Sequence, residues 1–321
     1  MTTTISLKFS VIASFVLLIP DVNLALAVTP SFVLSAVRFE GNGVGSLDQF
    51  DSAGNLLREI PIDGFPSSVA MDRVGNAYVI LNQLHIGGGW RVDKYGPAGQ
   101  SLGTIVPSAG DNLLGLGIDT ADRLYVGHNS ITDTVRRFEL DGAPLGIFAT
   151  VSTPGPGAPF ALEFDSAGRL YVPDSYAVER FDANGASLGV FATVPDFGNT
   201  FVTDLAFDSL GTLYVHTLDD KIFKFDTAGA QLDSLNLPGD GGNRFDIDRN
   251  DTLYLAGSSI TKYSTTGASI GVFAAGRGGE YYDIAIFDPI PEPGTGVLFA
   301  IGIVATPRLR RAFCMTAVHH H

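Results

Sequence analysis

The sequence contains a single cysteine, which excludes an intrachain disulfide and therefore a disulfide-stapled scaffold. Charged residues make up only 17% of its 321 residues, where about 25% is usual. Basic residues are scarcer than acidic ones, 20 against 34, and the formal net charge is −14. A surface that binds nucleic-acid phosphates needs clustered Lys and Arg. The sequence thus argues against a nucleic-acid partner.

Glycine and apolar residues are abundant by contrast. There are 38 glycines, apolar residues reach 45%, and 22 residues are Phe. Such a chain can bury a sizeable core, which argues against intrinsic disorder. The glycine content favours turns and strands over helices.

Residues 1–27 have the pattern of a secretory signal peptide. One basic residue, Lys8, precedes an apolar stretch over residues 11–20, and Ala25-Leu26-Ala27 supplies a small-x-small cleavage site. A buried strand or an uncleaved anchor is the alternative, but the apolar run is short for a membrane span. We predict that residues 1–27 are removed on export.

The C-terminal part contains three ordered elements. They are the motif Pro291-Glu292-Pro293, an apolar stretch over residues 296–306, and the cluster Arg308, Arg310 and Arg311. Residues 290–311 resemble the PEP-CTERM sorting signal. The resemblance implies a short transmembrane helix, transient insertion in the inner membrane of a Gram-negative bacterium, and processing by an exosortase-type enzyme. The protein would then reach the cell surface or the extracellular matrix.

Two features depart from that signal. The thirteen residues between Pro293 and Pro307 span about 20 Å as a helix, short of a roughly 30 Å hydrocarbon core, so the helix would be a marginal anchor. The tail, residues 312–321, continues through Cys314 to His319-His320-His321. We favour a truncated tag or a tail without function over a metal site, and whether these histidines are native stays open.

Residues 28–289 form a repeat array built from two units. The first, as in LEFDSAGRLYVP, is anchored by aspartates spaced 40 to 47 residues apart: Asp72, Asp119, Asp165, Asp208 and Asp248. The second recurs six times around an aromatic residue: Phe50, Tyr95, Phe138, Phe181, Phe225 and Tyr263. Each unit has two strand-like runs around a polar turn, which predicts a β-hairpin. Two hairpins per period make the four-stranded blade of a β-propeller.

The count of units predicts how the ring closes. Five copies of the first hairpin stand against six of the second, so one blade lacks two strands. Residues 282–288 match the first strand of the repeat, and residues 31–39 form a strand-like run before the first complete hairpin. We predict an all-β, six-bladed propeller in which the chain ends share one blade, an arrangement that leaves no open sheet edge between them.

The recurring pattern D-x-x-G-x-L-Y-V, on a six-blade count, resembles the NHL-repeat and gluconolactonase-like six-bladed propellers. That resemblance implies a fold more than a function. For the five turn aspartates, we favour an Asx turn, in which the carboxylate accepts backbone N–H bonds, over a metal site.

The face opposite these turns is the predicted ligand face. Its candidate residues follow the L-Y-V strands: His85, His128, Asp174, His216, Asp219 and Asp220. The three histidines raise the possibility of a zinc site. Because they follow their tyrosines at offsets of seven, three and two residues, we favour solvated loop histidines.

The sequence predicts no catalytic residue. It has no G-x-S-x-G, H-E-x-x-H or Walker motif. We therefore predict an exported binding or structural module, with an extracellular polysaccharide or surface proteins as its partners. The alternative is a metal-dependent lactonase or related hydrolase that holds Ca or Zn on the loop face. The gluconolactonase-like Glu-Gly-Pro motif is not matched, because Glu40 is followed by Gly41-Asn42.

Overall fold

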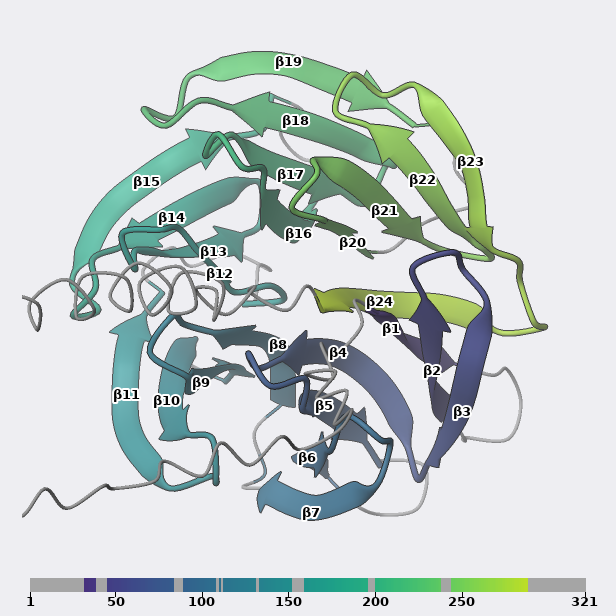
Figure 1. Ribbon diagram of the computed structural model, residues 1–321. Helices are drawn as coiled ribbons and strands as arrows, with labels where there is room; N and C mark the ends of the chain where they lie inside the picture. Colours follow the sequence, from purple (N-terminus) through teal and green to yellow (C-terminus); the bar gives the residue numbers. More distant parts are fainter. Residues whose placement is uncertain are drawn as a thin grey trace, which may run out of the picture.

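The structure, a computed structural model, describes residues 32–38, 45–83, 89–107, 110, 112–130, 133–151, 159–195, 200–237 and 244–287. These residues form six four-stranded antiparallel sheets arranged as a ring (Figure 1). This confirms the predicted six-bladed propeller. The described residues contain no helix long and apolar enough to cross a membrane, and the predicted signal peptide and sorting segment lie outside them.

From the inside of each blade outward the strands follow the order of the chain, except that β24, the last strand, is innermost in blade 1. Blade 1 consists of β24 (Glu280–Phe287), β1 (Phe32–Arg38), β2 (Gly45–Asp51) and β3 (Leu56–Ile62), and blade 2 of β4 (Phe65–Met71), β5 (Ala77–Asn82), β6 (Trp90–Tyr95) and β7 (Ser101–Val106). Blade 3 consists of β8 (Asn112–Ile118), β9 (Arg123–Asn129), β10 (Thr134–Glu139) and β11 (Pro144–Thr150), and blade 4 of β12 (Glu163–Phe164), β13 (Leu170–Asp174), β14 (Ala177–Phe181) and β15 (Ser187–Thr193). Blade 5 consists of β16 (Val202–Phe207), β17 (Leu213–Thr217), β18 (Lys221–Phe225) and β19 (Gln231–Asn236), and blade 6 of β20 (Arg244–Ile247), β21 (Thr252–Ala256), β22 (Ile260–Ser264) and β23 (Ser269–Ala274).

Blade 1 is shared between the two ends of the ring, as the unit count predicted. β24 pairs antiparallel with β1 from Phe32 opposite Phe287 to Arg38 opposite Glu280. The Ser35 hydroxyl adds a 2.7 Å hydrogen bond to the carbonyl of Asp283. Position 288 of the predicted strand lies outside the described residues.

The core lies between neighbouring blades, and the tyrosine of each L-Y-V strand is central to it. The ring of Tyr125 packs against Phe148 of its own blade at 5.0 Å and against Phe164 of the next blade at 4.7 Å. Tyr171 repeats the arrangement with Phe191 and Phe207. Each such aromatic pair adds about 0.5–1.5 kcal/mol beyond the area that it buries. The repeated tyrosine thus joins one blade to the next.

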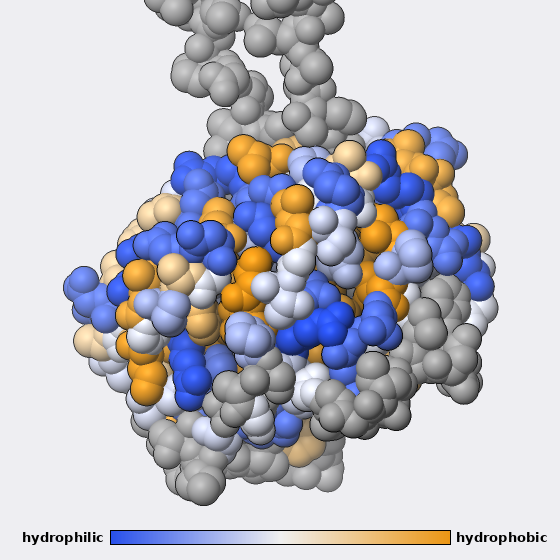
Figure 2. Space-filling view, turned by 90° about the horizontal axis from the view of Figure 1, so that it is seen from below, coloured by the Kyte–Doolittle hydropathy of each residue, from blue (hydrophilic) through white to orange (hydrophobic). Residues whose placement is uncertain are grey.

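The outermost strands expose apolar side chains but interrupt their own ladders. Ile147 on β11 and Val190 on β15 are both exposed. Gly146 and Gly189 precede them with positive φ angles of 95° and 81°, and the pairing register shifts beside both glycines. Bulges of this kind discourage edge-to-edge pairing with another sheet. In Figure 2, apolar and polar patches alternate over one side of the ring.

Candidate functional site

The propeller has two faces, because the strands of each blade alternate in direction. The aspartate turns join the first strand of a blade to the second, as between β4 and β5, and define the turn face. The connections from second to third strands, and from one blade to the next, define the loop face. Phe287 ends β24 opposite Phe32 at the start of β1. Both ends of the ring therefore lie on the turn face.

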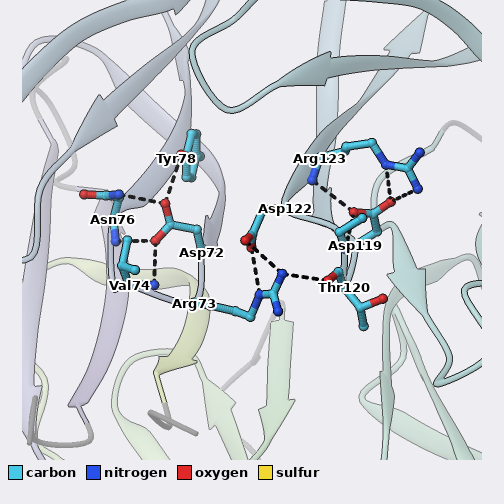
Figure 3. A network of polar contacts seen from close by, with 10 residues as sticks. Asp72, Arg73, Val74, Asn76, Tyr78, Asp119, Thr120, Asp122 and Arg123 are labelled. Carbon is cyan, nitrogen blue, oxygen red and sulfur yellow. Dashed lines mark hydrogen bonds and ion pairs between the residues drawn. The ribbon is translucent and has the colours of Figure 1, made fainter. Parts of the chain in front are cut away.

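The turn aspartates have one hydrogen-bond pattern. Oδ1 of Asp72 accepts the backbone N–H groups of Val74 and Asn76 at 3.1 and 2.8 Å, and Oδ2 accepts the Tyr78 hydroxyl at 3.1 Å (Figure 3). The other four turn aspartates accept the same three hydrogen bonds, from the backbone N–H groups two and four residues later and from the tyrosine hydroxyl six residues later. They are Asp119, Asp165, Asp208 and Asp248. This is the geometry of an Asx turn whose second oxygen fixes the core tyrosine.

Neighbouring turns are also joined to each other. The Arg73 guanidinium donates to both carboxylate oxygens of Asp122, at 3.0 and 2.9 Å, and to the carbonyl of Thr120 at 2.7 Å (Figure 3). Ser209 and Asp251 make a corresponding link between blades 5 and 6. The described contacts of the turn face thus stabilise the ring.

Replacing Asp165 by Ala is expected to lower the free energy of unfolding by about 2 kcal/mol, because two backbone N–H groups and the Tyr171 hydroxyl lose their acceptor. Urea denaturation measures the change. Asp165→Asn, which keeps one side-chain oxygen as an acceptor, should lower the free energy of unfolding by less. If Asp165→Ala instead removed a stoichiometric cation from the protein, a metal role would replace the structural one.

The central channel is a cavity of about 340 Å³ lined by the six innermost strands. Its walls carry five charged side chains that no sequence motif indicates: Glu163, Asp204, Arg244, Asp246 and Asp283. Asp204 and Arg244 lie four residues before their turn aspartates, where blades 3 and 4 have Gly115 and Ala161. If the repeats are aligned on their turn aspartates, Asp204 and Arg244 stand out as charged residues at a position that is small in other blades.

Three of these carboxylates join adjacent blades. In each, one oxygen accepts the N–H of the following residue, and the other accepts an N–H from the innermost strand of the next blade. The interblade bonds run from Phe245 to Asp204 at 2.8 Å, from Ile286 to Asp246 at 2.9 Å and from Val69 to Asp283 at 2.7 Å. We call these the carboxylate latches. The Ser68 hydroxyl accepts the N–H of Leu116 in the equivalent way.

The latches also show how β24 fits the repeat. Asp283 occupies the place of Asp204, so Phe287 occupies the place of the turn residue Asp208. The 40-residue spacing from Asp248 predicts Asp288 at that place, one residue later. The bulge in the β24–β1 ladder just before Asp283 recurs just before Ser68 in the β4–β5 ladder and just before Asp204 in the β16–β17 ladder, so β24 keeps the register of the repeat.

The channel holds more carboxyl groups than cations. Arg244 donates to the Phe160 carbonyl at 2.7 Å, and its guanidinium lies 3.9 Å from the Asp204 carboxylate. Burial raises the pKa of Asp204 to about 8 and that of Asp246 to about 7. Burial and the charges of Asp246 and Asp204 raise the pKa of Glu163 well above its ordinary value. Near neutral pH these channel carboxyl groups are therefore partly protonated, whereas carboxyl groups exposed to water are ionised.

The histidines lie where the sequence did not place them. His128 and His216 belong to β9 and β17 rather than to loops, and only 2% and 1% of their surfaces are exposed. The expectation that they are solvated is wrong. Nδ1 of His216 lies 2.6 Å from the Thr203 hydroxyl. Burial and, to a smaller extent, the positive charge of Arg244 lower the pKa of His216 to about 4. His85 lies outside the described residues.

The predicted aspartates of the loop face gather on blades 4 and 5. Asp219 accepts 2.7 Å hydrogen bonds from the hydroxyls of Thr200 and Thr217 and pairs with Lys221 at 2.7 Å. Burial alone would raise its pKa, but these partners hold the pKa at about 2. Asp220 follows in the same turn with a positive φ of 59°.

Asp174 lies in the neighbouring blade, at the end of β13. Burial raises its pKa to about 6. Within the described part of the chain, its Oδ2 accepts no hydrogen bond, and no group of three or more His, Cys, Asp or Glu side chains is arranged to hold a metal ion.

Comparison with known proteins shows the fold. The sequence matches no family model and no curated protein. The structure is similar to the nidogen/laminin complex (TM-score 0.67, 13% identity, 81% of this chain and 99% of that chain). A protein of unknown function from Bacteroides caccae matches with a TM-score of 0.62 at 15% identity, over 81% of this chain and 99% of the other. A gluconolactonase from Xanthomonas campestris matches with a TM-score of 0.55 at 16% identity, over 79% and 89%.

These neighbours define the class: the chain is a six-bladed β-propeller with structural neighbours of NHL and gluconolactonase-like type. At identities of 13% to 16% the likeness extends to the fold alone.

Proposed function

We propose that the protein is an exported binding module of the cell surface or extracellular matrix, and that its loop face is the binding surface. The observation that carries the proposal is the position of the two ends of the ring. The ring begins at Phe32 and ends at Phe287, side by side on the turn face. While the segment at residues 290–311 is inserted, it would turn this face toward the membrane and leave the loop face accessible to a partner.

Two further observations support a binding role. On the turn face, the described polar side chains bind other residues of the ring, as in the aspartate turns and the Arg73–Asp122 ion pair. One structural neighbour is a complex of two proteins, nidogen and laminin. The partners that we propose are an exosortase-type enzyme during sorting and an extracellular polysaccharide or surface protein afterwards.

A metal-dependent lactonase or related hydrolase is the second candidate, suggested by the gluconolactonase among the neighbours. Such an enzyme would use Ca or Zn as a Lewis acid. In the channel, both oxygens of Asp204, Asp246 and Asp283 already accept backbone N–H groups, so a cation would compete with the latches. Elemental analysis of the purified full chain distinguishes the candidates, because the enzyme would retain a stoichiometric ion.

Replacing Pro291-Glu292-Pro293 by three alanines is expected to block removal of the sorting segment in the native host. Insertion should persist, because residues 296–306 and the three arginines remain. The altered protein should stay in the inner membrane with its tail attached, as cell fractionation and mass spectrometry would show. If the unaltered mature protein also kept residues 294–311, a plain short anchor would replace the sorting signal.

A further inference from the structure

Among the described residues, three exposed apolar side chains lie on the loop face where blades 4 and 5 meet. We call them the aromatic platform: Tyr176, Phe201 and Leu218. Tyr176 lies in the two-residue turn between β13 and β14, Phe201 directly precedes β16, and Leu218 begins the turn between β17 and β18. Their exposed fractions are 40%, 38% and 58%.

The backbone holds the three positions together. The N–H of Val202 donates to the Ser175 carbonyl at 2.7 Å, and the N–H of Leu218 donates to the Phe201 carbonyl at 2.9 Å. The Asp219 side chain adds the bonds from Thr200 and Thr217 that tie the two segments to each other. Because these backbone segments are already held by hydrogen bonds, a partner that binds here loses little affinity to the ordering of loops.

The repeat itself does not require aromatic residues at this junction. Where blade 6 meets blade 1, the N–H of Tyr281 donates to the Gly257 carbonyl at 2.8 Å, as Val202 does to Ser175. At that junction the places of Tyr176 and Phe201 are taken by Ser258 and by the exposed Glu280. The same backbone geometry thus forms with polar residues, so the aromatic platform is not needed for folding.

The surroundings of the platform are acidic. Lys221, the cation at the start of β18, is already paired with Asp219. Burial and the charge of Asp219 raise the pKa of Asp220, and burial with the charges of Glu179 and Asp133 raises that of Asp174. Three carboxyl groups, those of Asp174, Asp219 and Asp220, thus lie beside one cation, and this local excess of acidic groups agrees with the net charge of −14. Apolar contact and a negative field therefore coincide on this part of the loop face.

We infer that the aromatic platform binds a protein segment in which Lys or Arg side chains flank apolar ones. The inference rests on the proposed function, because it uses the loop face as the binding surface. Apolar side chains of the partner would cover Phe201 and Leu218, while its cations would lie beside Asp219 and Asp220. A neutral polysaccharide would stack on the aromatic rings but would leave the acidic border unused.

The test uses the full chain in detergent and the fluorescein-labelled peptide Gly-Lys-Leu-Arg-Trp-Lys-Phe-Gly, with fluorescence anisotropy as the readout. We expect saturable binding that weakens as NaCl rises from 50 to 300 mM. Phe201→Ser and Leu218→Ser, which leave the charge unchanged, should each raise Kd by about fivefold or more. Leu232→Ser changes an equally exposed aliphatic residue on β19 and should leave Kd unchanged.

Three results would overturn the inference, provided that circular dichroism shows each variant folded. They are equal binding of the charge-reversed peptide Gly-Glu-Leu-Asp-Trp-Glu-Phe-Gly, an unchanged Kd in both platform variants, and saturable binding of cellohexaose that the same variants abolish. The last result would assign the platform to a polysaccharide. Peptide binding does not depend on tail removal, so a failed sorting experiment and a failed platform experiment can be told apart.

Discussion

A chain that ends at residue 280 is expected to lose cooperative unfolding, or to melt at least about 10 °C below a chain that ends at residue 289. The truncation removes β24, whose Tyr281, Ile284 and Phe287 are buried. Burying a large apolar side chain is worth about 1.5–3 kcal/mol, so three of them approach the whole stability of a typical domain. Differential scanning calorimetry of both chains, each starting at residue 28, measures the difference.

The truncation also breaks the ring at two places. Asp283 no longer accepts the N–H of Val69, and Asp246 loses the N–H of Ile286. Strand β1 becomes an unpaired inner edge, which favours aggregation. The chain ending at 289 keeps β24 and loses only the tail, so it controls for tail removal. Equal melting temperatures for the two chains would show that β24 does not close the ring.

The blade architecture was predictable because one local pattern carries it. In D-x-x-G-x-L-Y-V the aspartate orders its own turn and binds the tyrosine six residues on, and that tyrosine fills the space between blades, as at Asp119 and Tyr125. The turn, the strand and the interblade contact are therefore specified within eight residues. Counting the copies was enough to predict the shared blade.

The channel and the histidines were not predictable in the same way. The pattern predicts loops after L-Y-V, but β9 and β17 continue through His128 and His216, which pair with Thr134 and Ile222. The latches depend on which way an innermost strand turns its side chains toward the next blade. That direction follows from packing between segments about 40 residues apart, which no local pattern specifies.

The carboxylate latches give the final prediction: the free energy of unfolding should fall by about 2 kcal/mol as the pH rises from 6.5 to 8. In the folded chain the pKa of Asp204 is about 8 and that of Asp246 about 7, against about 3.9 when unfolded. The folded state then binds more protons than the unfolded state, so stability is lost as these groups ionise. His216, whose pKa is lowered to about 4, acts with the opposite sign, but only below about pH 6.5.

Urea denaturation at pH 6.5, 7, 7.5 and 8 measures this slope, and two matched variants assign it. Asp204→Asn cannot ionise, so its stability should be lower than that of the parent at pH 6.5 but should change by less than about 1 kcal/mol up to pH 8. Asp219→Asn replaces a carboxylate whose pKa of about 2 lies far below this range, so the parent slope should persist. Stability that is level or rises between pH 6.5 and 8 would mean that the latches are ionised throughout. In that case Arg244 and the backbone N–H groups would offset the cost of burying the charge.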